Sequence, residues 1–188
     1  MVSKSQDQSM NFQSSQTYRN LQAAFEGECK ANGKYQIYGT KAKEDGYEEI
    51  AEVFLETAVN EKEHAEIWLK YLNHSEIPDT KDNLTDAIQG ESYEWHTMYQ
   101  EFANVARKEG YDEIAEMFDN VAMIERHHDF RYRKYLEELN TNTNLCKKEP
   151  IMWICMNCGN LYWGKCAPEK CPVCGYPQGF FKPMCDCM

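Results

Sequence analysis

GYEEIAEVF at residues 46–54 recurs as GYDEIAEMF at residues 110–118, an offset of 64 positions. The same offset carries Glu61 to Glu125 and one KYL triplet to another. Apolar residues follow three- and four-residue steps on both sides of each Gly-Tyr break, a pattern typical of two helices joined by a turn. The repeat therefore predicts a mostly α protein in which two helical hairpins pack as a four-helix bundle.

Each hairpin contributes two expected helices. They run from about Thr17 to Glu44, from Tyr47 to Leu72, from Leu84 to Glu109 and from Tyr111 to Leu139. The stretch NHSEIPDTKDN at residues 73–83 would join the two hairpins. Eleven extended residues reach roughly 36 Å, about the length of a helix, so a crossover connection between the hairpins is feasible.

One spacing differs between the two copies of the repeat. Glu28 precedes Glu61 by 33 residues, whereas Glu91 precedes Glu125 by 34 residues. The stretch between Glu91 and Gly110 contains no loop signal that could absorb the extra residue. We therefore predict a π-bulge within the third helix, a feature often found at functional sites.

Several polar residues lie on helix faces that are otherwise apolar. In VNEKEHAEIW, residues 59–68, Glu61 and His64 share a face with Phe54 and Trp68. Burying an unpaired charge is expensive, so such groups become neutral, find partners or bind a metal. The residues of this kind lie roughly 22–28 Å from their turns, at one level of the expected bundle. They are Glu28, Glu61, His64, Glu91, Glu94, Glu125 and His128.

This set matches the ligands of di-metal carboxylate sites in helical bundles. Such sites take a Glu from each of two helices and Glu-x-x-His from each of the other two. Two divalent ions would allow several carboxylates to stay ionised in a core. The alternative is that these are surface groups on solvated helices, which a single Glu-x-x-His would favour. Two copies at one level favour the metal site. Tyr35 and Tyr99 could hydrogen-bond the ligands, although core packing explains each tyrosine equally well.

Two CxxC pairs follow the helices. CMNC at 155–158 and CPVC at 171–174 are separated by 12 residues, so the candidate ligands are Cys155, Cys158, Cys171 and Cys174. Four thiolates suit a tetrahedral iron or zinc, and ligand type alone leaves that choice open. In a reducing compartment the other cysteines are expected to be free thiols or metal ligands rather than disulfides. They are Cys29, Cys146, Cys166, Cys185 and Cys187, of which Cys166 could compete as a ligand.

The distribution of charge indicates two domains. The chain has a net charge of −11, yet its last 37 residues carry three lysines against one glutamate and one aspartate. We expect a helical domain over residues 1–145 and a cysteine-rich domain over residues 146–188. An acidic chain without a basic stripe argues against nucleic acid or an anionic membrane as partner. Because no apolar run approaches roughly 20 residues and the start is polar, the expected location is the cytoplasm.

Four segments resemble the ligand motifs of the rubrerythrin family, and the resemblance continues to about residue 181. The segments are AFEGECKANGKY, ETAVNEKEHAE, GESYEWHTMY and ERHHDF. The run WICMNCGNLYWGKCAPEKCPVCGYP is similar to the truncated rubredoxin domain of that family, which implies iron rather than zinc in the four-cysteine site. The resemblance also implies a ferritin-like fold. It further implies that Glu94 and His64 compete for one iron, with the histidine favoured on reduction.

The function implied by the resemblance is that of a non-haem di-iron peroxidase. The enzyme would reduce hydrogen peroxide to water in oxidative-stress defence. Electrons would come from NAD(P)H through a reductase, often with a rubredoxin, and would pass through the rubredoxin-like iron centre. The resemblance also implies a homodimer in which one chain's rubredoxin centre serves the other chain's di-iron site.

Two other functions stay open on the residues. The same bundle supports ferroxidase activity with iron storage, although a fused four-thiolate centre has no role in storage. A structural zinc ribbon in place of the iron centre would instead leave an adaptor or a metal-sensing protein. Metal content and a visible spectrum would separate these functions.

Overall fold

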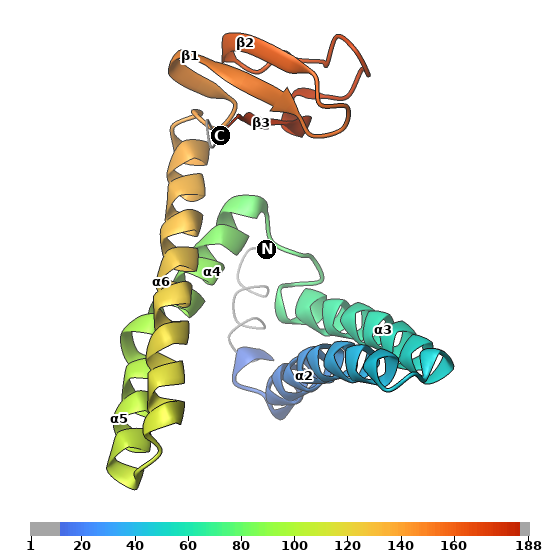
Figure 1. Cartoon of the computed structure of the whole chain (residues 1–188), viewed down its shortest axis with the longest axis vertical. Coiled ribbons are helices and arrows are strands. Elements are labelled where there is room, and N and C mark those ends of the chain that lie inside the picture. Colours follow the sequence, from blue (N-terminus) through green and yellow to red (C-terminus); the bar gives the residue numbers. More distant parts are fainter. Residues whose placement is uncertain (1–11, 185–188) are drawn as a thin grey trace, which may run out of the picture. The chain divides into compact units, whose positions relative to one another are not determined.

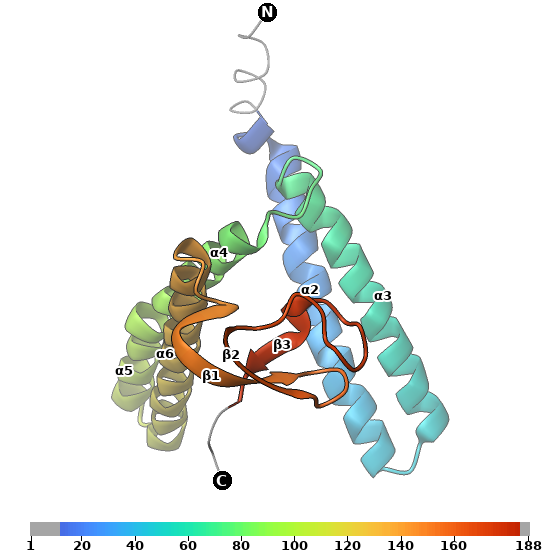
Figure 2. The same ribbon diagram turned by 90° about the horizontal axis from the view of Figure 1, so that it is seen from above.

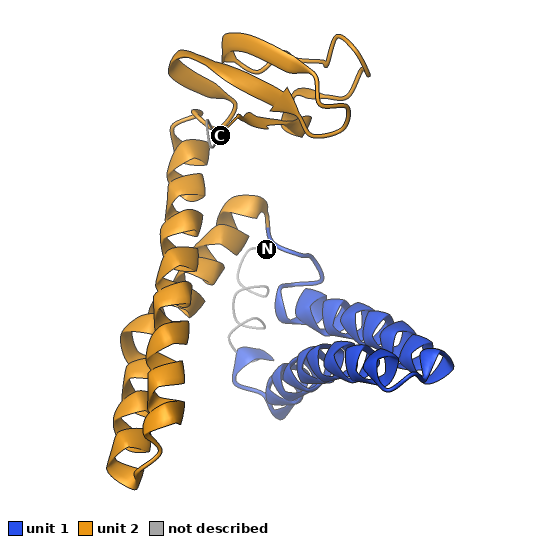
Figure 3. Ribbon diagram, in the orientation of Figure 1, with its two compact units in different colours: residues 1–78 blue, residues 79–188 orange. Residues whose placement is uncertain are grey.

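The structure is a computed structural model that describes residues 12–184 (Figure 1). Its helices are α2 (Gln16–Glu44), α3 (Glu48–Leu72), α4 (Thr80–Tyr93), the π-helix η1 (Glu94–Met98), α5 (Tyr99–Glu109), α6 (Asp112–Asn140) and the 3-10 helix η2 (Gln178–Phe180). Its strands are β1 (Cys146–Cys155), β2 (Leu161–Cys166) and β3 (Phe181–Pro183). The polar start and the cysteines Cys185 and Cys187 lie outside the described residues. The chain forms two compact units, Met1–Pro78 and Asp79–Met188 (Figure 3).

The first unit is a hairpin in which α2 runs alongside α3 (Figure 2). Its turn is closed by Gly46, which takes a left-handed conformation with φ 83°, as helix C-termini commonly require. The backbone N–H of Tyr47 then donates to the carbonyl of Ala42 over 2.8 Å. The buried residues of the two helices are all small. They are Gly39, Ala42, Ala51, Ala58 and Ala65.

The helices of the second unit repeat this hairpin. Gly110 has φ 85°, and the backbone N–H of Tyr111 donates to Ala106 over 2.8 Å, as at the first turn. α4, η1 and α5 all pack against α6. Three alanines, Ala103, Ala106 and Ala115, form the buried cluster near the turn, with Phe118 against it. Both hairpins predicted from the repeat are therefore confirmed.

The expected π-bulge is confirmed in the third helix. The π-helix η1 covers Glu94–Met98 and begins at the fifth carboxylate of the candidate set. A π turn accommodates one residue more than an α turn. The insertion explains why the spacing from Glu91 to Glu125 exceeds that from Glu28 to Glu61.

The expected start of the third helix at Leu84 is wrong by four residues. α4 begins at Thr80 because the side chain of Asp79 accepts hydrogen bonds from the backbone N–H groups of Lys81 and Asp82, over 2.8 and 3.0 Å. An aspartate in this position is a strong helix N-cap. The connection between α3 and α4 is therefore seven residues, 73–79, rather than the eleven used in the crossover estimate.

The C-terminal residues form a small antiparallel sheet with strand order β2-β1-β3. Trp153 on β1 is fully buried, and its indole N–H donates to the carbonyl of Gly164 on β2 over 3.0 Å. Phe181 on β3 belongs to the same core, which also contains two of the cysteines. An ion pair of 2.8 Å between Lys147 and Glu138 links the sheet to the end of α6.

Cys146 and Cys166 form a disulfide, so the expectation that they are free thiols or metal ligands is wrong. The two residues are directly opposite in the antiparallel pairing of β1 with β2, which brings their sulfurs into contact. Cys166 is therefore unavailable as a competing ligand. Cys29, by contrast, is an exposed free thiol on α2, which agrees with the expectation of a cysteine outside any disulfide.

Among residues 12–184, no helix is both long enough and apolar enough to cross a lipid bilayer. The expected fold class is confirmed, since long helices precede a small sheet that carries the cysteine cluster.

Candidate metal centres

The first unit brings together one ligand from α2 and two from α3. The Nδ1 atom of His64 lies 2.9 Å from a carboxylate oxygen of Glu61 and 3.9 Å from one of Glu28. The indole N–H of Trp68 donates to the other oxygen of Glu28 over 3.4 Å, which orients that carboxylate. The imidazole is 52% exposed and the two carboxylates are 26% and 17% exposed, so one side of the cluster is open.

The second unit repeats this arrangement with one ligand from α4 and two from α6. The Nδ1 atom of His128 lies 2.7 Å from a carboxylate oxygen of Glu125 and 3.5 Å from one of Glu91. Burial and the charge of Glu125 raise the pKa of Glu91, while His128 acts in the opposite direction. Carboxylates crowded in this way repel one another unless a cation compensates them.

Each of the two clusters fits a metal ion. In each, one donor atom from every residue lies within 4.8 Å of the other two, a separation that one bound cation can bridge. Two carboxylates with one imidazole are the donors that iron takes in helical-bundle sites. The clusters lie in different compact units, so Glu28, Glu61 and His64 form one group and Glu91, Glu125 and His128 form the other. That the two groups join in one di-metal site stays a proposal.

Glu94 and the two candidate tyrosines lie around these groups. Glu94 is partly buried at the first position of η1. Burial raises the pKa of Tyr99, and the charge of Glu94 adds the next largest effect, so the phenol lies within the field of the ligand carboxylates. The ring of Tyr99 also packs against Phe118, with centroids 6.0 Å apart. The ring of Tyr35 packs in the equivalent way on the first hairpin, and its hydrogen bond to a ligand stays a prediction.

One buried residue was missed by the sequence analysis. Asp129, which follows the ligand His128, is only 5% exposed. It accepts a hydrogen bond from the indole N–H of Trp95 in η1 over 3.0 Å, and Arg133 pairs with its other oxygen over 2.6 Å. Asp129 therefore ties the π-helix to α6 beside the ligands. The arginine four residues further along the helix was the available signal, since an i, i+4 pair can neutralise a buried aspartate.

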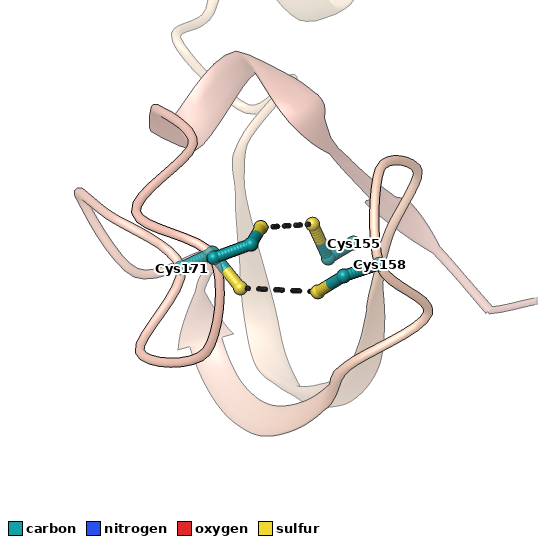
Figure 4. Close-up of side chains that lie close together, drawn as sticks. Cys155, Cys158 and Cys171 are labelled. Atoms are coloured by element: carbon teal, nitrogen blue, oxygen red, sulfur yellow. Dashed lines mark hydrogen bonds between the residues drawn. The ribbon is translucent and has the colours of Figure 1, made fainter.

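The four cysteines of the two CxxC pairs converge in the small sheet domain (Figure 4). The sulfurs of Cys155 and Cys174 are 3.8 Å apart, and those of Cys158 and Cys171 are 3.6 Å apart. A tetrahedral ion with metal–sulfur bonds of about 2.3 Å requires sulfur–sulfur separations of about 3.8 Å. The side chains are therefore arranged as a four-cysteine metal site requires.

Both CxxC pairs are held by the same backbone turn. The glycine after each pair takes a left-handed conformation, with φ 75° at Gly159 and 73° at Gly175. Its N–H donates over 2.9 Å to the carbonyl of the first cysteine, Cys155 or Cys171. Glycine is favoured here because other residues are strained at positive φ.

The thiols of this site differ in acidity. The pKa of Cys174 is lowered to about 6, mainly because the backbone N–H of Tyr176 donates to its sulfur and the side chain of Asn157 donates as well. The pKa of Cys158 is raised to about 12. The backbone N–H of Asn160 lowers it, but hydrogen bonding to Cys174, burial and the other two sulfurs together outweigh that effect. The surroundings of Cys174 therefore favour its thiolate, the form in which cysteine binds a metal.

Family comparison agrees with this pair of centres. The rubrerythrin family profile matches residues 19–136 and 82–152, and the profile described as rubrerythrin, rubredoxin-like domain, matches residues 153–182. A putative rubrerythrin of Methanocaldococcus jannaschii is 39% identical over 91% of this chain and 94% of its own length. The rubrerythrin of Porphyromonas gingivalis is 37% identical over 97% of both chains.

A solved structure gives a further comparison. The fully reduced state of nigerythrin, described as all ferrous, is 28% identical and covers 90% of this chain and 87% of its own. The TM-score is 0.35. Nigerythrin of Nitratidesulfovibrio vulgaris is 30% identical in sequence over 88% of this chain and 85% of its own.

Proposed function

The chain belongs to the rubrerythrin family, and we propose that it is a non-haem di-iron peroxidase that reduces hydrogen peroxide to water. Membership makes it a di-iron protein of ferritin-like fold with a rubredoxin-like iron domain, in a family of oxidoreductases. The observation that carries the proposal is the presence, in one chain, of carboxylate–imidazole clusters and a four-cysteine site.

We propose that the two three-residue clusters together hold the iron pair. Glu28, Glu61 and His64 would bind from one hairpin, and their counterparts Glu91, Glu125 and His128 from the other. When bound, the two irons would supply two electrons and the Lewis acidity that weakens the O–O bond. Glu94 would be the additional ligand, in exchange with His64.

Reduction of hydrogen peroxide to two waters consumes two electrons and two protons, so the protein must hold protons beside the site. The phenol oxygen of Tyr99 keeps its proton well above neutral pH, because burial and the charge of Glu94 raise its pKa. A neutral phenol beside carboxylates can donate a hydrogen bond to an anionic oxygen as charge develops. Tyr99 would therefore position the reacting oxygen through a hydrogen bond, and Tyr35 would have the equivalent place on the first hairpin.

The four-cysteine site would return electrons one at a time. Cys158 is exposed, whereas Cys155 and Cys171 are buried in the core of the sheet domain, so one edge of the site faces solvent. A site open on one side can accept an electron from a docked donor, here a rubredoxin or an NAD(P)H-dependent reductase. We propose that the enzyme acts as a homodimer in the cytoplasm, in which the four-cysteine centre of one chain serves the di-iron site of its partner.

The proposal is tested by metal analysis and rapid mixing. Protein produced in cells supplied with iron should be red and hold about three irons per chain. After anaerobic reduction, mixing with hydrogen peroxide should oxidise both centres, with about one peroxide consumed per two electrons released by the irons. Zinc in the four-cysteine site would remove the electron supply and overturn the proposed relay, and many irons per chain would point to ferroxidase activity instead.

A variant at Glu94 separates the peroxidase from simpler iron binding. Glu94→Ala should keep both irons, or nearly so, and lose peroxide turnover by about tenfold or more. Glu101→Ala is the matched control, since Glu101 is exposed on the adjoining helix α5 and belongs to no cluster of ligands among the described residues. Turnover that is unchanged in Glu94→Ala would contradict the role assigned to this carboxylate.

A further inference from the structure

Each hairpin carries half of the ligands that a di-metal site needs. Three donors of the first unit lie within 4.8 Å of one another, as do three of the second, and neither group reaches the two Glu-x-x-His pairs and two further glutamates of a complete site. The two groups are equivalent by the 64-residue repeat, so each supplies one half of a complete site. The site is incomplete until two hairpins meet.

Each hairpin also leaves large apolar side chains exposed at the same repeat positions. The equivalent pairs are Tyr38 and Phe102, Tyr47 and Tyr111, Ile50 and Ile114, Val53 and Met117, Val59 and Met123, and Tyr71 and Tyr135, with 42% to 61% of each side chain exposed. Between the helices of each hairpin the buried residues are mostly alanine and glycine. Faces of this kind are normally covered by a packing partner.

The connection between the hairpins limits which copy can supply that partner. A ferritin-like fold has one long crossover, which returns the chain along the bundle so that the helices it joins are parallel. Leu72 ends α3 eleven residues beyond Glu61, and Thr80 begins α4 eleven residues before Glu91. For both glutamates to lie at one level, the connection must therefore span roughly 33 Å along the axis, at 1.5 Å per helical residue.

Residues 73–79 cannot cover this distance in the conformation that the structure shows. Drawn out completely, the chain from Leu72 to Thr80 reaches about 28 Å. Its first part is also folded into a turn, in which His74 and Ser75 have positive φ and the backbone N–H of Ser75 donates to Lys70 over 2.6 Å. Closure within one chain would thus require this turn to open and the neighbouring helix ends to unwind.

We propose that two copies of this chain exchange hairpins. In the resulting dimer the α2–α3 hairpin of each copy packs on the α4–α6 helices of the other, and each di-metal site contains Glu61 from one chain and Glu125 from its partner. Exchange of an identical element removes the span that the short connection cannot make and covers both apolar faces, a known low-cost route to a dimer. The proposal rests on the di-metal assignment but not on peroxide turnover.

Complementation between two inactive variants tests the exchange. One variant, Glu61→Gln with His64→Gln, removes two ligands of the first hairpin. The other, Glu125→Gln with His128→Gln, removes the equivalent pair of the second. The two chains are given different affinity tags, produced together, and the mixed dimer is purified through both tags. The measured quantity is the iron bound at the carboxylate sites, which is the total iron minus the iron of the four-cysteine sites.

With exchanged hairpins, a mixed dimer has one intact site and one site that lacks all four ligands. It should therefore hold about half of the wild-type carboxylate-bound iron, whereas each variant alone holds close to none. The matched control pairs the first variant with Glu28→Gln, which damages the same hairpin in both chains, so no iron should return. Absence of recovered iron in the first mixture would overturn the proposal, as would a wild-type protein that is monomeric by light scattering.

A longer connection gives a second test that involves no ligand. Eight Gly/Ser residues inserted between Glu76 and Ile77 would add about 28 Å of reach and allow each chain to close on itself. The lengthened protein should keep its helical content by circular dichroism. When both ligand variants carry the insertion, their mixed dimer should bind at least severalfold less carboxylate-site iron than the mixed dimer without it. The same insertion between Asn142 and Thr143 is the control and should leave recovery unchanged. Equal recovery in both insertions would contradict the argument from the connection.

Discussion

Gly39 is buried where α2 packs against α3, and its replacement by alanine should separate packing from helix propensity. A Cβ atom at this position would lie 2.9 Å from Cγ and Cδ2 of Leu55 and 3.3 Å from the carbonyl oxygen of Ala51. Gly33 lies on the same helix, and a Cβ atom there would meet nothing within 4 Å. Both substitutions gain the same helix propensity, so the difference between them measures crowding alone.

The expected magnitudes follow from these distances. Alanine is more favourable than glycine in a helix by about 1 kcal/mol, so Gly33→Ala should raise the free energy of unfolding by about that amount. Overpacking at Gly39 should cost about 1–3 kcal/mol, because Leu55 must leave its rotamer and the backbone of Ala51 must move. After the propensity gain, Gly39→Ala should be neutral or destabilised by up to about 2 kcal/mol relative to wild type.

The assay is urea-induced unfolding of the iron-free chain, followed by far-UV circular dichroism for wild type and both variants under one condition. The quantity of interest is the difference between the urea midpoints of the two variants. Multiplied by one m-value used for both, it gives their difference in free energy of unfolding. Because Glu28 and Glu61 are held on the same two helices, Gly39→Ala should also weaken iron binding more than Gly33→Ala does. Equal stability of the two alanine variants would refute the reasoning, since it would mean that Leu55 moves aside at no cost.

Three further predictions concern the metal and disulfide sites. Cys174→Ser should weaken cobalt(II) binding by more than about tenfold. Binding to the wild-type four-cysteine site should weaken as pH falls, because protons compete for the thiolates, and more steeply below about 6, where Cys174 is protonated as well. Cobalt–thiolate absorption measures both effects. Replacing both Cys146 and Cys166 by serine should destabilise the sheet domain by about 3 kcal/mol, as expected for a disulfide between residues 20 positions apart. Urea unfolding followed by tryptophan fluorescence measures the loss. Glu91 has a raised pKa, so its carboxyl destabilises the iron-free fold when ionised. The free energy of unfolding should therefore rise as pH falls through that pKa. Thermal melts at several pH values check this, and Glu91→Gln should reduce the change of stability with pH.

The hairpins could be predicted in detail because their signals are local. Glycine at the two turns, Gly46 and Gly110, interrupts a three- and four-residue apolar spacing, and helix ends within the hairpins agree with the expected ones to one residue. The π-helix was predictable from a count, because the extra residue between Glu91 and Glu125 had no loop to occupy. The start of α4 was missed because its N-cap, Asp79, was read as part of a loop.

The metal ligands could be named from the sequence for a similar reason. An i, i+3 spacing on a helix fixes which side chains are neighbours, so the contact between Glu61 and His64 follows from the backbone alone. The disulfide between Cys146 and Cys166 could not be foreseen in this way, because it depends on the register between two strands. The expected compartment pointed instead to free thiols or metal ligands.

By itself, then, the sequence determined the helical repeat, the three ligands on each hairpin and the two cysteine turns, since each depends on contacts within a few residues or on one helix face. Only the tertiary structure decided the pairing of Cys146 with Cys166, because strand register depends on which segments pack together. The seven-residue length of the connection depends instead on a local contact, since Asp79 caps the helix that follows it. That length bears in turn on which copy of the chain can complete each di-metal site.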